Sequence, residues 1–169
     1  MPVNLELTPP PPTEEFSRAD LEFRGVDHSG PSYEARIFFD NARANASTAR
    51  DPSTGYAGSF HVFGHGGCFG ELGHCDIRVG GGSPYDKRLP HPLTPQFKPV
   101  VVTEALRRVI QTRGGEPFQV RVVAVVANGG AGRGAGRPAD PLKFESVSLI
   151  LYHDPSAAGI ALSGAASPA

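Results

Sequence analysis

The sequence predicts a mainly β protein: an antiparallel β-sandwich with one short α-helix. Several segments alternate apolar and polar residues with the period of two that is typical of a half-buried strand. Turn-rich stretches separate these segments, and only one stretch has the apolar spacing of a helix. The 169 residues are enough for one two-layer domain with tails at its ends.

Six strands are expected along the chain. The clearest is 33–39 (YEARIFF), in which apolar side chains alternate with Glu34 and Arg36. The run 118–127 (FQVRVVAVVA) is apolar on both faces over much of its length, which indicates a buried strand. The six predicted ranges are 21–26, 33–39, 59–65, 97–102, 118–127 and 144–152.

One helix is expected over 103–112. Thr103 has the residue type of an N-cap, Glu104 suits the first turn, and Gly114 suits the position after the last turn. The expected buried face consists of Leu106, Val109 and Ile110, and the expected solvated face carries Arg107, Arg108 and Arg113.

Composition divides the chain into three parts. Residues 1–19 form a Pro-rich N-terminal segment, in which 9–15 (PPPPTEE) should be an extended spacer. Residues 20–154 form the β domain, and 155–169 form a tail of small residues that we expect to be disordered. Within the domain, 66–93 is a long loop rich in Gly, Pro and Asp, of the kind that is usually functional or disordered.

Charge and hydropathy argue against several classes of function. The formal net charge is -1 and no long basic run is present, so the sequence predicts no nucleic-acid binding. No apolar run approaches the roughly 20 residues that span a bilayer, so no membrane partner is expected. The first 15 residues lack the basic and apolar regions of a signal peptide, and a cytoplasmic location is expected.

The order of these elements resembles a known domain. YEARIFFDN, GYAGSFHVFGH, the helix TEALRRVI, and the strands FQVRVVAVV and FESVSLILYHD follow one another as in the C-terminal domain of plant polyphenol oxidases. The resemblance covers roughly 20–153. It implies a β-sandwich that packs over the di-copper site of a tyrosinase-like catalytic domain and shields it. The partner implied is therefore a tyrosinase-like copper enzyme.

The sequence departs from that family at GCFGELGHC, where plant members have a His- and Lys-rich stretch. Within this stretch and just before it, four residues form a candidate metal site: His65, Cys68, His74 and Cys75. Thiolate and imidazole ligands favour Cu(I) or Zn(II), and no other cofactor is indicated. A Cys68–Cys75 disulfide and an ordinary surface loop remain alternatives.

His61 is excluded from this set of ligands. A strand over 59–65 would hold His61 about 13 Å from His65, at ~3.3 Å per residue, which is too far for one metal ion.

An oxidase in this chain alone is not predicted. Its six histidines include none on the expected helix, whereas a type-3 copper pair requires histidines on a helix bundle. A blue-copper centre usually needs an axial methionine, and the only methionine is Met1. Ser59, His61 and Asp76 lack the strand–turn–helix context of a nucleophilic serine.

The predicted function is therefore a non-catalytic accessory or shielding domain that acts with a tyrosinase-like copper oxidase. Its contact surface would consist of the face bearing His61 together with the 66–93 loop. The alternative is a copper-handling protein that delivers Cu(I) to such an enzyme. A third hypothesis is an enzyme of unknown type with a mononuclear metal in the loop.

Overall fold

The computed structural model describes residues 2–64, 85, 94–126 and 141–153 of the chain. This part is mainly β and contains one α-helix, as the sequence predicts. Its elements in chain order are β1 (Val3–Leu7), β2 (Arg18–Val26), β3 (Tyr33–Phe39), the 3₁₀ turn η1 (Pro52–Thr54), β4 (Tyr56–Val62), β5 (Gln96–Val101), α1 (Thr103–Arg113), β6 (Phe118–Val126) and β7 (Ser146–Tyr152).

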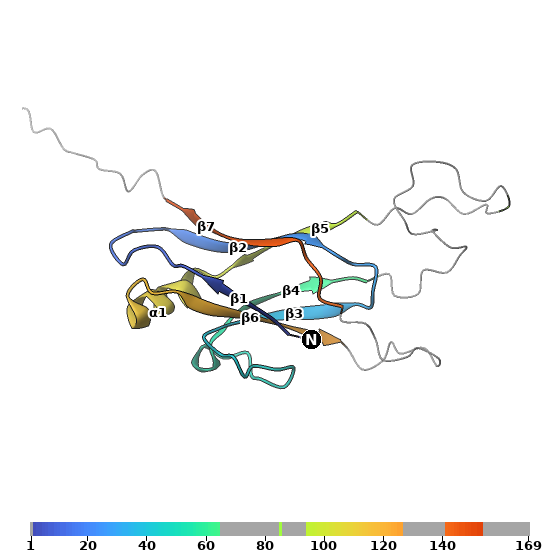
Figure 1. Ribbon diagram of the computed structural model, residues 1–169, viewed down its shortest axis with the longest axis horizontal. Helices are drawn as coiled ribbons and strands as arrows, with labels where there is room; N and C mark the ends of the chain where they lie inside the picture. The colour runs from blue at the N-terminus through green and yellow to red at the C-terminus, as the bar shows by residue number, and fades with distance from the viewer. Residues whose placement is uncertain (1, 65–84, 86–93, 127–140, 154–169) are drawn as a thin grey trace, which may run out of the picture.

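The strands form two sheets that lie one above the other (Figure 1). One sheet has the order β1-β6-β3-β4 and the other the order β5-β2-β7. Every strand pair in both sheets is antiparallel. The predicted antiparallel sandwich with one short helix is therefore confirmed.

The core lies between the sheets, because the inward-facing residues of both are apolar. Phe23 of β2 is fully buried, and its ring lies 4.9 Å from Phe60 of β4 and 5.4 Å from Phe144, measured between ring centroids. Such tilted and edge-on pairs add to the free energy gained from burying the rings. The largest fully buried apolar side chains of this core are Phe23, Phe118, Leu21, Ile37 and Leu106. Phe38, also fully buried, packs instead in a second cluster with Ala44 and Val123.

The two sheets approach each other along the β4–β5 side. Gly58 of β4 has φ 154°, and a Cβ there would lie 2.7 Å from Cγ1 of Val100 in β5. A residue without a side chain is therefore needed at this crossing. Since β4 and β5 meet here, β1 and β7 are the strands at the opposite side of the sandwich.

Helix α1 connects β5 to β6 and buries Ala105, Leu106 and Val109. It ends at Gly114, whose φ of 64° and N–H···O bond to Ile110 (2.8 Å) form the expected C-terminal cap. The prediction of Thr103 as N-cap is wrong. Val102 occupies that position without a side-chain cap.

The prediction of a purely solvated arginine face on the helix is wrong for two of its three arginines, which have protein partners. Arg113 Nε donates to the Asp40 carboxylate (2.6 Å). Arg107 donates to Glu104 (2.6 Å) and to the carbonyl oxygen of Phe16 (3.1 Å). Both arginines thus tie the helix to the strands beside it or to the segment before β2.

The N-terminal segment contains a strand that the sequence analysis did not predict. Strand β1 pairs with β6 over five residues, from Val3 opposite Val122 to Leu7 opposite Phe118. The following prolines do not form a free spacer, because Pro9 and Pro10 are buried and Glu14 N–H donates to Pro11 O (2.9 Å) in a turn. This part of the chain joins β1 in one sheet to β2 in the other.

Among the residues that the structure describes, no helix is long and apolar enough to cross a membrane.

Candidate functional site

The four predicted metal ligands, His65, Cys68, His74 and Cys75, lie outside the described residues. The structure therefore neither brings them together nor separates them. It does describe the residues at both ends of the segment that contains them, Gly64 after β4 and Thr94 before β5. The described ranges contain no group of three or more His, Cys, Asp or Glu residues that could hold a metal ion.

The first end of that segment is fixed at Gly64. Its N–H donates to Ser32 Oγ (3.0 Å). A side chain at this position would collide with the backbone of Gly30 and Pro31, so only glycine allows the approach. Gly64 is thereby held against the connection between β2 and β3.

The second end is fixed by His28 of the same connection. His28 is 8% exposed, and its Nε2 lies 2.9 Å from the carbonyl oxygen of Thr94. Its Nδ1 lies 3.2 Å from the amide nitrogen of Gln96. A neutral imidazole with its hydrogen on Nε2 satisfies both contacts, because it donates to the carbonyl and accepts from the amide.

The connection of residues 27–32 therefore holds both ends of the 65–93 segment. Its own conformation is stabilised by Asp27, whose carboxylate accepts from the N–H of Ser29 (2.8 Å) and lies 3.8 Å from Lys143 Nζ. The hydrogen bond from the Ser29 backbone is the main cause that lowers the pKa of Asp27. Sequence reasoning missed this role of His28, since an isolated histidine before a turn carries no distinctive signal.

An exposed pair of residues, His61 and Phe63, precedes the segment. Phe60 and Val62 of β4 are buried, whereas His61 is exposed and the residue Phe63 is 80% exposed. Buried and exposed side chains thus alternate here, as expected for a strand with one face on the core. The predicted strand limits of 59–65 are wrong, because β4 begins at Tyr56 and ends at Val62.

The early end of β4 removes the reason for excluding His61 as a ligand. That exclusion assumed strand spacing as far as His65, and the described strand stops three residues before it.

Glu34 of β3 lies opposite His61 in the sheet register. It accepts hydrogen bonds from Arg36 Nε (2.9 Å) and Arg50 (3.1 Å). Partial burial acts to raise the pKa of Glu34. The hydrogen bond and charge of Arg36, together with the charge of Arg50, outweigh this effect and hold that pKa below its ordinary value. The carboxylate is therefore ionised at neutral pH and forms ion pairs with Arg36 and Arg50.

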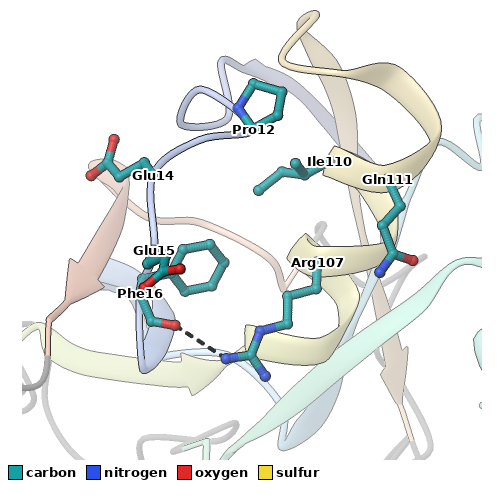
Figure 2. A pocket seen from close by; sticks show the side chains of 7 residues that line it. All are labelled: Pro12, Glu14, Glu15, Phe16, Arg107, Ile110 and Gln111. Carbon is teal, nitrogen blue, oxygen red and sulfur yellow. Dashed lines mark hydrogen bonds between the residues drawn. The ribbon is translucent and has the colours of Figure 1, made fainter. Parts of the chain in front are cut away.

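Two shallow grooves flank helix α1. The first has a volume of about 440 Å³ and lies between the helix and the segment before β2. Figure 2 shows Arg107 reaching across from the helix to the Phe16 carbonyl, with Pro12 and Ile110 at the other end. The Arg107 guanidinium lies 5.5 Å from the centre of the Phe16 ring. The groove's strongest donor thus already has protein partners.

The second groove, of about 380 Å³, lies on the other side of the helix beside Asp40 and η1. The Asp40 carboxylate also has protein partners, because it accepts hydrogen bonds from Arg113 Nε and from the N–H of Gln119 (3.1 Å). The second groove is also lined by Ser53, whose hydroxyl donates to the Asp51 carboxylate (2.5 Å). Outside the two grooves, the pair His61–Phe63 is an exposed surface next to the 65–93 segment.

Comparison of the chain with family models, curated proteins and solved structures finds no match. The resemblance to the polyphenol oxidase C-terminal domain therefore stays a prediction.

Proposed function

We propose that this protein is a non-catalytic accessory domain that acts with a tyrosinase-like copper oxidase and shields its copper site. The observation that carries the proposal is the exposure of Phe63, at 80%, beside exposed His61 at the end of β4. Both residues belong to the face that the sequence analysis assigned to partner contact.

An exposed aromatic side chain of this kind suits a protein interface. Burying a phenylalanine ring against a partner is worth about 1.5–3 kcal/mol, and aromatic residues are common among the residues that dominate binding energy. The ring emerges from a rigid base, since β4 pairs with β3 and Gly64 is fixed by Ser32 immediately afterwards. A rigid base reduces the entropy lost when the surface docks.

The test uses the full chain and a purified type-3 copper tyrosinase from which its own C-terminal domain has been removed. We expect the chain to bind this enzyme and to reduce its rate of catechol oxidation. The variant Phe63→Ser should weaken binding at least tenfold. Val101→Ser is the matched control, because Val101 is also exposed (54%) but lies on β5. Equal binding by the parent and Phe63→Ser, or no binding by either, would refute the proposal.

A second candidate function is copper handling by His65, Cys68, His74 and Cys75. The observation that favours it is the anchoring of Gly64 and Thr94 by one short connection, which fixes the start and the end of the segment that carries these residues. Soft thiolates would favour Cu(I).

Competition titration against a Cu(I) chelator tests this candidate. Replacing both cysteines by serine removes two of four ligands and should abolish tight binding. His61→Ala is an informative companion variant: unchanged affinity supports the four-residue set, and a large loss adds His61 to it. Equal, weak affinity of the parent and the double-serine protein would reject the site.

A further inference from the structure

The side of the sandwich formed by β1 and β7 is incompletely covered by the described residues. On the opposite side β4 and β5 approach closely, and the core there is closed. On this side the inward-facing apolar residues pack against the core but stay only partly buried. They are Val3, Leu5 and Leu7 of β1, and Val147, Leu149 and Leu151 of β7.

Strand β7 lacks the features that normally protect an edge strand. Edge strands commonly carry a charged residue, a proline or a bulge, which discourages pairing with another chain. Strand β5 contains Lys98 and Pro99 and has an irregular register with β2, and β1 contains Glu6. Strand β7, SVSLILY, has none of these and pairs with β2 in unbroken register over seven residues. No other described strand pairs with it.

We propose that β7 pairs antiparallel with β7 of a second copy of this chain. The pairing is centred on Leu149, which lies opposite Leu149 of the second copy. It joins two three-stranded sheets into one continuous six-stranded sheet with a two-fold axis through its centre. In this register Val147 lies opposite Leu151, and Ser148 lies opposite Ile150.

The side chains of β7 are complementary to themselves in this register. Directly opposed residues of an antiparallel pair lie on the same face, so the half-buried leucines and valine of both copies meet on the core side. No Asp, Glu, Lys, Arg or His side chain lies within the paired strands. Beyond each end, exposed Glu145 lies opposite exposed His153 of the second copy. The imidazole of His153 already contacts Glu15 O (2.7 Å) and the Glu14 carboxylate (3.5 Å) in its own chain, so the complementarity rests on the apolar pairs.

Other registers fit less well. A shift of two residues that brings Ser148 opposite itself places Glu145 opposite Leu151, so the leucine loses its apolar neighbour and faces a carboxylate. Face-to-face stacking of the two outer surfaces is also disfavoured. Arg18, Asp20, Glu22 and Arg24 alternate on the outer face of β2, where Asp20 is buried in its ion pair with Arg18 (2.7 Å). A two-fold axis along or across the strand would therefore bring the exposed arginines of the two copies together.

The first experiment measures the mass of the full chain by sedimentation equilibrium over a range of concentrations. We expect the parent to dimerise, and Ser148→Lys to raise the dissociation constant of the dimer about tenfold or more, since each new ammonium would oppose Ile150 of the second copy. The fold should tolerate this change, because Ser148 is only half-buried and lies opposite Glu22 of β2.

The control adds the same charge at the other edge of the same sheet. Val101→Lys on β5 lies opposite Asp20, as Ser148 lies opposite Glu22, and it should leave the dimer intact. A parent that stays monomeric at every concentration, or a dimer that survives Ser148→Lys unchanged, overturns the proposal. Binding of an extended peptide by a strictly monomeric parent counts against the second copy as well.

Cross-linking tests the register directly. In a background with Cys68→Ser and Cys75→Ser, one protein carries Ser148→Cys and another carries Ile150→Cys. Mild oxidation should cross-link the mixture, because the two new thiols face each other, and should leave each protein alone largely uncross-linked. Efficient cross-linking of either protein with itself, or none in the mixture, overturns the register.

Discussion

Substitutions at Asp40 should separate backbone strain from side-chain contacts in the stability of this fold. Asp40 follows β3 and has φ 50°, the left-handed conformation that non-glycine residues seldom adopt. Its N–H donates to Gln119 O (2.8 Å), and its carboxylate accepts from Gln119 N–H (3.1 Å) and from Arg113 Nε (2.6 Å). The side chain thus holds the end of β3 to β6 and to helix α1.

The magnitudes follow from these contacts. Removing the hydrogen bond to Gln119 costs about 1 kcal/mol. The ion pair with Arg113 contributes about 0.5 kcal/mol, because both side chains are partly exposed, at 42% and 26%. Asp40→Ala loses both contacts and fits the left-handed backbone poorly, so we expect a loss of about 2 kcal/mol. Asp40→Gly loses the same contacts but relieves the strain, and should lose about 1 kcal/mol.

The assay is urea unfolding followed by far-UV circular dichroism, because the chain contains no tryptophan to report by fluorescence. The free energies of unfolding are compared with one shared value for the slope of free energy against urea concentration. Asp40→Asn, which tolerates the left-handed region and keeps an acceptor, should be the most stable of the three variants. Equal stability of the alanine and glycine variants would show that the backbone at Asp40 is unstrained and would refute the reasoning.

Two further substitutions test the surroundings of the candidate site. Since the pKa of Glu34 is held below its ordinary value of 4.5, its ionised form stabilises the fold above about pH 4.5, and this contribution is lost as the pH falls through the lower folded value. Glu34→Gln should therefore lower the free energy of unfolding at pH 7 and flatten its decrease on acidification; a parallel pH dependence of both proteins would contradict this. Gly64→Ala should destabilise the fold, because the added carbon meets the backbone of the β2–β3 connection. Gly30→Ala, which meets nothing within 4 Å, is its control, and equal unfolding midpoints of the two variants would count against the anchoring.

The strands were predictable where alternation coincided with burial. Residues 33–39 alternate because β3 lies between two strands with one face on the core, and the structure has the same limits. Strand β1 has the same alternation in Val3, Leu5 and Leu7. It was missed because the proline run that follows it suggested a segment outside the domain. Its pairing with β6, more than a hundred residues away, leaves no local signal.

The helix shows how tertiary contacts override a local rule. Its range and its glycine cap follow from residue types alone, since Gly114 adopts the left-handed conformation that the cap needs. Thr103 has the right type for an N-cap, but its hydroxyl instead accepts from the N–H of Ala19 in β2 (3.0 Å). A side chain that can bond either its own helix or a neighbouring strand cannot be assigned from sequence.

Only part of the candidate site could be predicted from the sequence. Its ligand set could be proposed from residue types. The role of residues 27–32 in fixing both ends of the 65–93 segment depends on how β2, β4 and β5 are arranged in space. This arrangement separates the two proposed functions. Freeing Gly64 with Ser32→Ala should disturb partner binding and copper binding alike, because both depend on where the segment begins. Phe63→Ser should affect only the former and the double-serine variant only the latter. Loss of both activities in either of these two variants would mean that docking and metal binding use one surface, and that copper passes to the enzyme through the contact itself.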